Sequence, residues 1–244
     1  MPWIQHISVV WPFCAFLAFL VLFLVLAARM PVRAPLAFRQ VNVFGYRIKA
    51  CVAMELARNH ADLRAVLNMA APEQEATRED KEQARRREEK TIADLRKSLK
   101  DDTALILSYT LLFLSAALLA ARVCSHGDVI SLASVVLALV AAVADFRENH
   151  GMAKALHPES RDECSGNPPP GDANDLSAPI RRWSIVKWSA LTVLGMALGL
   201  ALFLLSGAGG PALMAGIAGC FLLVGGGYCG WLLLRWWQAP GAGW

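Results

Sequence analysis

Five long apolar segments dominate this chain of 244 residues and constrain what it can fold into. A helix needs ~20 apolar residues to cross a hydrocarbon layer of ~30 Å, and each segment is close to that length. A helix is also suited to lipid because it satisfies its own backbone hydrogen bonds. We therefore predict an all-α, polytopic helical membrane protein with five spans. The segments cover residues 7–28, 104–121, 129–144, 185–206 and 211–234.

The first segment, 7–28, resembles the core of a signal peptide in its hydropathy but differs from one in its flanks. Residues 1–6 carry no Lys or Arg, whereas Arg29, Arg33 and Arg39 follow the segment. A signal peptide has its positive charge before the apolar core, and its core is shorter. The sequence therefore predicts a membrane span with the N-terminus outside and residue 29 inside.

The remaining Lys and Arg residues test this orientation. Five spans with an outer N-terminus place 29–103, 145–184 and 235–244 on the inner side. That arrangement puts 23 of the 24 basic residues inside and leaves Arg122 alone outside. Basic residues favour the cytosolic side, so we expect a multi-pass protein of a plasma or inner membrane with a cytosolic C-terminal tail.

Residues 29–71 form a mixed, cytosolic segment that we expect to be partly amphipathic and helical. From about residue 42 to residue 69, apolar residues recur with helical spacing, as at Phe44, Ile48 and Val52. This stripe could lie on the inner leaflet, with the nearby basic residues facing anionic lipid. Packing of the stripe on neighbouring helices is the favoured interpretation, because the amphipathic pattern is moderate.

Residues 72–103 change character and predict a charged cytosolic helix. Between residues 73 and 91 the only apolar residues are Ala76 and Ala84, so this stretch cannot be a core helix. Good helix formers dominate it, and Glu82 and Arg86 have i,i+4 spacing. Because no helix breaker precedes residue 104, we expect one helix from about 73 to about 121, a cytosolic stalk continuous with span two.

The other connections follow from composition. The segment 122–128 is short, so spans two and three (104–144) form a hairpin. The cytosolic segment 145–184 is polar and includes a stretch rich in Pro, Gly, Ser and Asp (158–179), which predicts a flexible loop. Spans four and five form a second hairpin, 185–234, and residues 235–244 are the cytosolic tail.

The densest group of potentially chemical side chains lies at 145–150, where the third span meets the inner polar segment. Asp145, Glu148 and Asn149 share one helix face through their i, i+3 and i+4 spacing. Carboxylates at a helix C-terminus oppose its dipole, so either the helix continues past residue 150 or these groups find cations. We expect one of the two carboxylates to pair with Lys187 or Arg147. An ion-pair cluster is the favoured interpretation, ahead of a cation or headgroup site.

Small residues gather in spans four and five. Gly195 and Gly199, and likewise Gly226 and Gly230, have the spacing of four that lets helices approach closely. These faces could pack within one chain or between copies of it. Spans two and three contribute hydroxyl side chains, which could line a pore, although bonding to their own backbone is the favoured interpretation.

Several kinds of site are not indicated. The six Cys residues show no CxxC pair, the five His residues follow no recurrent metal-ligand spacing, and we predict no catalytic residue, metal or cofactor. The run Arg85-Arg86-Arg87 is flanked by Glu82, Glu88 and Glu89, so its field is nearly neutral and nucleic acid is not an expected partner.

Three classes of function remain at this point. The favoured one is a non-enzymatic interaction or structural protein of the bilayer. It would be a homo-oligomer or the membrane subunit of a complex, with the stalk contacting other membrane or cytosolic subunits. The second is an oligomeric channel or gated pore. The third is an enzyme acting on lipid at the inner leaflet through Asp145 and Glu148.

Overall fold

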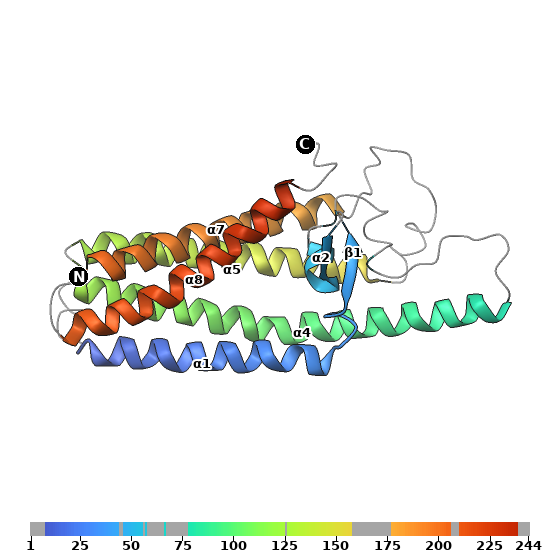
Figure 1. Cartoon of the computed structure of the whole chain (residues 1–244), viewed down its shortest axis with the longest axis horizontal. Coiled ribbons are helices and arrows are strands. Elements are labelled where there is room, and N and C mark those ends of the chain that lie inside the picture. Colours follow the sequence, from blue (N-terminus) through green and yellow to red (C-terminus); the bar gives the residue numbers. More distant parts are fainter. Residues whose placement is uncertain are drawn as a thin grey trace. The chain divides into compact units, whose positions relative to one another are not determined.

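The computed structural model describes residues 8–43, 46–55, 57, 66, 78–124, 126–157, 177–205 and 210–238. These residues are almost entirely helical (Figure 1). Five of the described helices are long and apolar enough to cross a membrane, which confirms the prediction of a helical multi-pass membrane protein. They are α1 (Val10–Arg33), α4 (Arg78–Val123), α5 (Gly127–Ala155), α7 (Ser177–Leu204) and α8 (Gly210–Gln238).

The chain divides into two compact units. Unit 1 consists of residues 1–26, 104–145 and 185–237, and unit 2 consists of residues 27–103, 146–184 and 238–244. Helices α1, α4, α5 and α7 each contribute one part to unit 1 and the other part to unit 2, and α8 belongs to unit 1 except for its last residue. Each unit has its own buried apolar cluster.

Unit 1 is an apolar helical bundle. Its core contains at least one residue from each of the five long helices, among them Phe16 of α1, Phe113 of α4, Ala138 of α5, Leu198 of α7 and Leu222 of α8. Large apolar side chains also cover its outside. This outer apolar surface suits lipid, because in a soluble protein so many exposed apolar residues would promote aggregation. The charged residues of unit 1 are Arg122, Asp128, Asp145, Lys187 and Arg235.

Unit 2 holds most of the charge of the chain but also buries a core. A two-stranded antiparallel sheet, β1 (Gln40–Val43) with β2 (Tyr46–Lys49), leads into the short helix α2 (Ala50–Glu55). The core around it includes Val41, Met54, Ile92, Leu156 and Ile180. Unit 2 therefore has the buried interior expected of a folded polar domain.

The strands correct the expectation of an amphipathic helix over 42–69. Residues 42–43 and 46–49 are strand, and helix begins only at Ala50. The apolar residues of this stretch fit the period of two of a strand as well as the period of about four of a helix. β-Branched and aromatic residues, which favour strands, lie on both sides of Gly45, and a glycine favours a turn between two strands. Except for residues 57 and 66, residues 56–71 lie outside the described part of the chain, so the rest of the expectation is not addressed.

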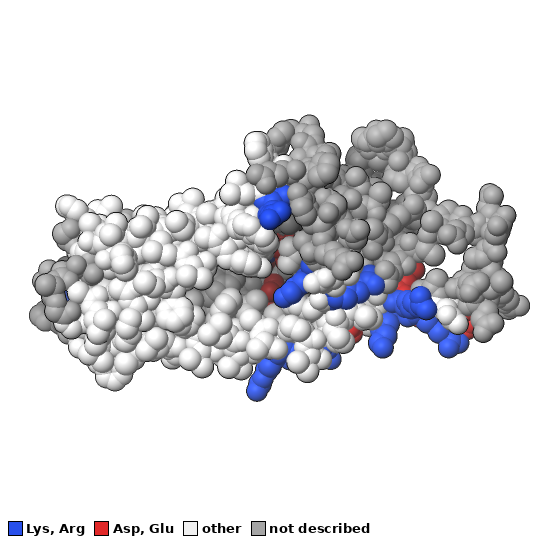
Figure 2. Space-filling model, viewed as in Figure 1, with Lys and Arg blue, Asp and Glu red and all other residues white. Residues whose placement is uncertain are grey.

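Helix α4 changes its surroundings along its length. In the α4 charged segment, defined here as residues 82–90, every described side chain is exposed except that of Glu88, which is half-buried. Figure 2 shows blue and red charged side chains on this part of α4, whereas the visible face of the unit 1 helices is nearly all white. Arg86 pairs with Glu82 at 2.6 Å. From Thr91 onward α4 turns Ile92 and Leu95 into the core of unit 2.

The loop expected at 158–179 lies mostly outside the described residues, because only residues 177–179 are described and these begin α7. The start of the long helix before Arg78, the turn at 206–209 and the tail from residue 239 also lie outside them. Helix α5 continues to Ala155, well past residue 150.

Candidate functional site

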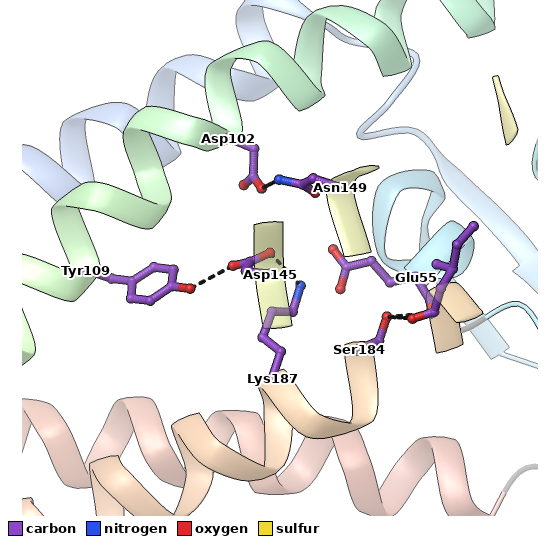
Figure 3. Close-up of polar contacts among 8 residues, drawn as sticks. Glu55, Asp102, Tyr109, Asp145, Asn149, Ser184 and Lys187 are labelled. Atoms are coloured by element: carbon purple, nitrogen blue, oxygen red, sulfur yellow. Dashed lines mark hydrogen bonds and ion pairs between the residues drawn. The ribbon is translucent and has the colours of Figure 1, made fainter. Parts of the chain in front are cut away.

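A polar triad lies inside unit 1, among helices that are otherwise apolar. The hydroxyl of Tyr109 on α4 donates a hydrogen bond to Oδ2 of Asp145 on α5, at 2.8 Å. The ammonium Nζ of Lys187 on α7 lies 3.3 Å from Oδ1 of the same carboxylate. Figure 3 shows the tyrosine and the lysine reaching Asp145 from opposite sides. Both oxygens of Asp145 are therefore bonded, and one carboxylate links three helices.

The triad is closed to solvent. The side chains of Asp145 and Lys187 are each 6% exposed, and Tyr109 is buried in the core of unit 1. The ammonium of Lys187 also lies 5.0 Å from the ring centroid of Trp188, a cation–π distance. A buried charge is tolerated when a partner neutralises it and hydrogen bonds satisfy it, and the triad meets both conditions. Its chemistry is that of a neutral structural link.

The other residues of the predicted 145–150 cluster belong to unit 2. Glu148 is fully buried, whereas the side chain of Arg147 is exposed. The amide of Asn149 donates to Oδ2 of Asp102 on α4, at 2.5 Å (Figure 3). Of the residues singled out from the sequence, the structure brings together Asp145 and Lys187, and it points Arg147 outward.

Two members of these polar contacts have no strong sequence signal. Tyr109 stands 36 residues before Asp145 and reads as an ordinary hydroxyl of an apolar span. Asp102 reads as part of a charged helix, yet it bonds Asn149. Only the antiparallel pairing of the hairpin 104–144, combined with the position of each residue near its polar end, could have suggested such contacts.

Unit 2 is held by further polar bonds that use the carboxylates of α4. Asp94 accepts a hydrogen bond from the backbone N–H of Leu36 at 2.9 Å, and Asp101 pairs with Arg33 at 2.8 Å. On α7 the hydroxyl of Ser184 donates to the backbone carbonyl of Glu55, at 2.8 Å (Figure 3). The carboxylates of Asp94 and Asp101 therefore join α4 to residues that precede it in the chain.

The four glycines predicted to pack helices, Gly195, Gly199, Gly226 and Gly230, lie where α7 and α8 meet. A Cβ atom added to Gly195 would lie 2.8 Å from Cα of Gly226, and one added to Gly199 would lie 3.0 Å from the carbonyl oxygen of Gly219. A Cβ atom on Gly230 would meet Thr192 at 3.1 Å. At Gly195 and Gly199 such short distances to backbone atoms leave no room for a side chain, so these two glycines allow close packing within one chain, whereas Gly230 meets the side chain of Thr192.

The Ser and Thr hydroxyl groups of span two bond their own helix, in contrast to the hydroxyl of Tyr109. Ser108, Thr110 and Ser115 each donate to a backbone carbonyl three or four residues earlier, at 2.7 Å in all three cases. This is the arrangement favoured from the sequence, and it leaves these donors bonded locally.

Nucleophilic and metal-binding chemistry gain no support from the described residues. Burial raises the pKa of the Cys51 thiol from 9.0 to about 12, and the charge of Glu55 adds to this effect, so Cys51 is a poor nucleophile at neutral pH. No group of three His, Cys, Asp or Glu side chains in the described part of the chain is arranged to hold a metal ion.

No protein-family model matches this chain, and it matches neither a curated protein nor a solved structure.

Proposed function

We propose that this chain is an integral membrane interaction protein, the membrane subunit of a complex or a homo-oligomer, that contacts its partner through the α4 charged segment. The supporting observation is the contrast along α4. Residues 82–90 expose almost all of their described side chains, whereas the same helix buries Ile92 and Leu95 a turn later.

A helical segment with no apolar face, such as the α4 charged segment, is not stabilised by burying apolar side chains. Another interaction must therefore stabilise it. Intrahelical ion pairs such as Arg85–Glu89, at 3.0 Å, contribute only ~0.3–0.5 kcal/mol each. Contact with a partner through this exposed polar surface would supply a reason for its composition. A charged partner surface is the natural match, because the segment carries both signs of charge.

The positions of the glycines favour the α4 charged segment, and not the glycine-rich faces of α7 and α8, as the region that contacts a partner. Gly195, Gly199 and Gly226 already face the opposing helix of the same chain. These glycines thus pack α7 against α8 within one copy of the chain. Their spacing is explained by this contact and does not require contact between copies. The proposal consequently rests on α4 and treats self-association and a different partner chain as alternatives that a mass measurement separates.

The proposed orientation places the start of α4 and the C-terminus in the cytosol and the N-terminus outside, in a plasma or inner membrane. Support comes from the excess of Lys and Arg in the segments that flank the apolar helices on one side. The closed Asp145 triad and the locally bonded hydroxyls of α4 lend less support to a lipid-acting enzyme or to a pore.

The test is affinity purification of the full chain in mild detergent, followed by native mass measurement. We expect a complex heavier than the 26.5 kDa of one copy, with integer multiples identifying a homo-oligomer. Two variants examine the contact region: deletion of residues 78–90, and the double swap Glu82→Arg with Arg86→Glu. The swap keeps the net charge and the i,i+4 pair but inverts the presented pattern, so both variants should lose the partner.

The matched control is the double change Arg85→Lys with Arg86→Lys, which keeps both charges and should keep the complex. A wild-type chain that is a lone 26.5 kDa species would refute the proposal. A complex that survives deletion of residues 78–90 would also refute it, since assembly would then depend on other surfaces.

A further inference from the structure

Outside the α4 charged segment, the described charged side chains on the unit 2 parts of α4, α5 and α7 differ in exposure according to their sign. In the parts of α4, α5 and α7 that belong to unit 2 beyond the α4 charged segment, the described carboxylates are buried or half-buried. Every described charged side chain that is exposed there is a cation. These cations are Arg96, Lys97 and Lys100 on α4, Arg147 and Lys154 on α5, and Arg182 on α7.

Three of the described carboxylates on the same helix parts are engaged elsewhere. Asp94 accepts the N–H of Leu36, Asp101 pairs with Arg33, and Asp102 accepts the amide of Asn149. Glu148, the remaining carboxylate on these helix parts whose side chain the structure describes, is fully buried. The described side chains therefore give these helix parts a cationic outward surface, even though the helices themselves carry both signs of charge.

The α4 charged segment provides a contrast within the same helix. There the exposed cations stand beside exposed carboxylates, as in the pairs Arg86–Glu82 and Arg85–Glu89. On the adjoining part of α4, Arg96 and Lys100 instead form a like-charged i,i+4 pair, an arrangement that destabilises an isolated helix by ~0.2–0.5 kcal/mol. An anionic counterpart removes that repulsion.

The positions of these cations identify the counterpart. Each lies within nine residues of the apolar part of its own helix, which at 1.5 Å per residue is at most about 14 Å along the axis. Headgroups occupy the layer just outside the hydrocarbon core, and charges interact across a screening length of ~8–10 Å at ordinary salt. Cations at such positions add ~1 kcal/mol each when the leaflet is anionic.

We propose that unit 2 binds anionic phospholipid headgroups through the exposed cations of α4, α5 and α7. The bound group is a lipid phosphate with net negative charge, and its acyl chains lie against apolar helices. Arg96 is already held in place by a 2.6 Å hydrogen bond from its guanidinium to the carbonyl oxygen of Leu156, so little side-chain freedom remains to be lost there. This role is independent of the partner contact assigned to the α4 charged segment.

The experiment counts lipid molecules retained by the full chain in mild detergent, by native mass spectrometry, with phosphatidylglycerol and phosphatidylcholine of identical acyl chains. We expect preferential retention of phosphatidylglycerol. The preference should fall as salt rises from about 0.1 M to about 1 M, because the screening length shrinks from about 10 Å to about 3 Å.

The test variant is Arg147→Gln with Lys154→Gln, two exposed residues seven apart and thus on one face of α5. We expect it to retain phosphatidylglycerol at least about five-fold more weakly, with phosphatidylcholine unchanged. The matched control, Arg87→Gln with Lys90→Gln, removes the same charge from the α4 charged segment and should stay within about two-fold of wild type. Arg147→Lys with Lys154→Arg should behave as wild type.

Three results would overturn the proposal. Equal retention of the two lipids would show that charge does not select the ligand. An equal loss in the control would show that net charge, and not this surface, is responsible. Displacement of phosphatidylglycerol by a short oligonucleotide or an acidic peptide that binds more tightly would assign the surface to a soluble polyanion.

Discussion

The Asp145–Lys187 ion pair should be strongly coupled, and a double-mutant cycle measures that coupling. The two charged groups lie 3.3 Å apart, and both side chains are 6% exposed. At an effective dielectric constant of ~20, charges at this distance attract by about 5 kcal/mol. Removing one partner leaves a buried charge without its counter-charge, which costs ~3–5 kcal/mol of stability. Removing both partners leaves no unpaired buried charge and avoids that cost.

We therefore expect Asp145→Asn and Lys187→Met each to lower the free energy of unfolding by ~3–5 kcal/mol. The double variant should lose less than about 2 kcal/mol, because the amide oxygen introduced by Asp145→Asn can still accept the Tyr109 hydroxyl and Met fills the volume of Lys. The resulting coupling is at least ~4 kcal/mol, above the ~0.5–3 kcal/mol typical of neighbouring residues.

The assay is unfolding of the purified chain in mixed micelles with increasing sodium dodecyl sulfate, followed by circular dichroism. Asp128→Asn serves as the control, because Asp128 is an exposed first-turn residue of α5 and Asn is also accepted near a helix start. Asp128→Asn should change the free energy of unfolding by less than about 1 kcal/mol. If the losses of the two single variants simply add in the double variant, the ion pair does not link the helices and the account of the triad is wrong.

Two further results are expected. Gly226→Ala should destabilise the bundle by ~1–3 kcal/mol in the same unfolding assay, because the added Cβ would meet the backbone N of Met196 at 2.8 Å. The control Gly225→Ala should be neutral or slightly stabilising, because the space around Gly225 is open. The Cys51 thiol, with its pKa raised to about 12, should resist alkylation at pH 8 in the folded chain and react once the chain is unfolded, as read by peptide mass mapping. Because the folded state holds this proton more tightly, the associated stability is present below about pH 9 and is lost as pH rises toward 12. Rapid labelling of Cys51 in the folded chain at pH 8 would contradict its raised pKa.

The sequence was sufficient to predict the five apolar helices, because their length and composition leave few alternatives in a bilayer. It was insufficient for β1 and β2, because Ile48 and its apolar neighbours fit the spacing of a helix and of a strand equally well. Single-chain periodicity cannot choose between the two when an apolar stretch is short. The packing of β1 and β2 against α2, and of Val41 in the unit 2 core, favours strands over a helix here.

The polar residues at the third span show a similar division. The charge of Asp145 at the end of an apolar segment implies that it needs a cation, and Lys187 was a candidate for that reason. Nothing local distinguishes Tyr109 from the other hydroxyl residues of span two, since its role depends on which face of α4 meets α5. The inward turn of Asp94, Asp101 and Asp102 is likewise a property of packing, and no charge pattern in the sequence separates them from the exposed Glu82 and Glu89.

The core of unit 2 has a consequence for biogenesis. Ile92 and Leu95 are synthesised before the second and third spans, whereas Met152, Leu156 and Ile180, which complete the same core, are synthesised after them. A ribosome that has released only residues up to 103 has therefore made an apolar stripe with part of its covering missing. That stripe stays open until the α4–α5 hairpin is made and Met152 and Leu156 follow it. Burial of Ile92 and Leu95 thus reports completion of the α4–α5 hairpin, and a chain whose hairpin stalls presents them to chaperones and proteases.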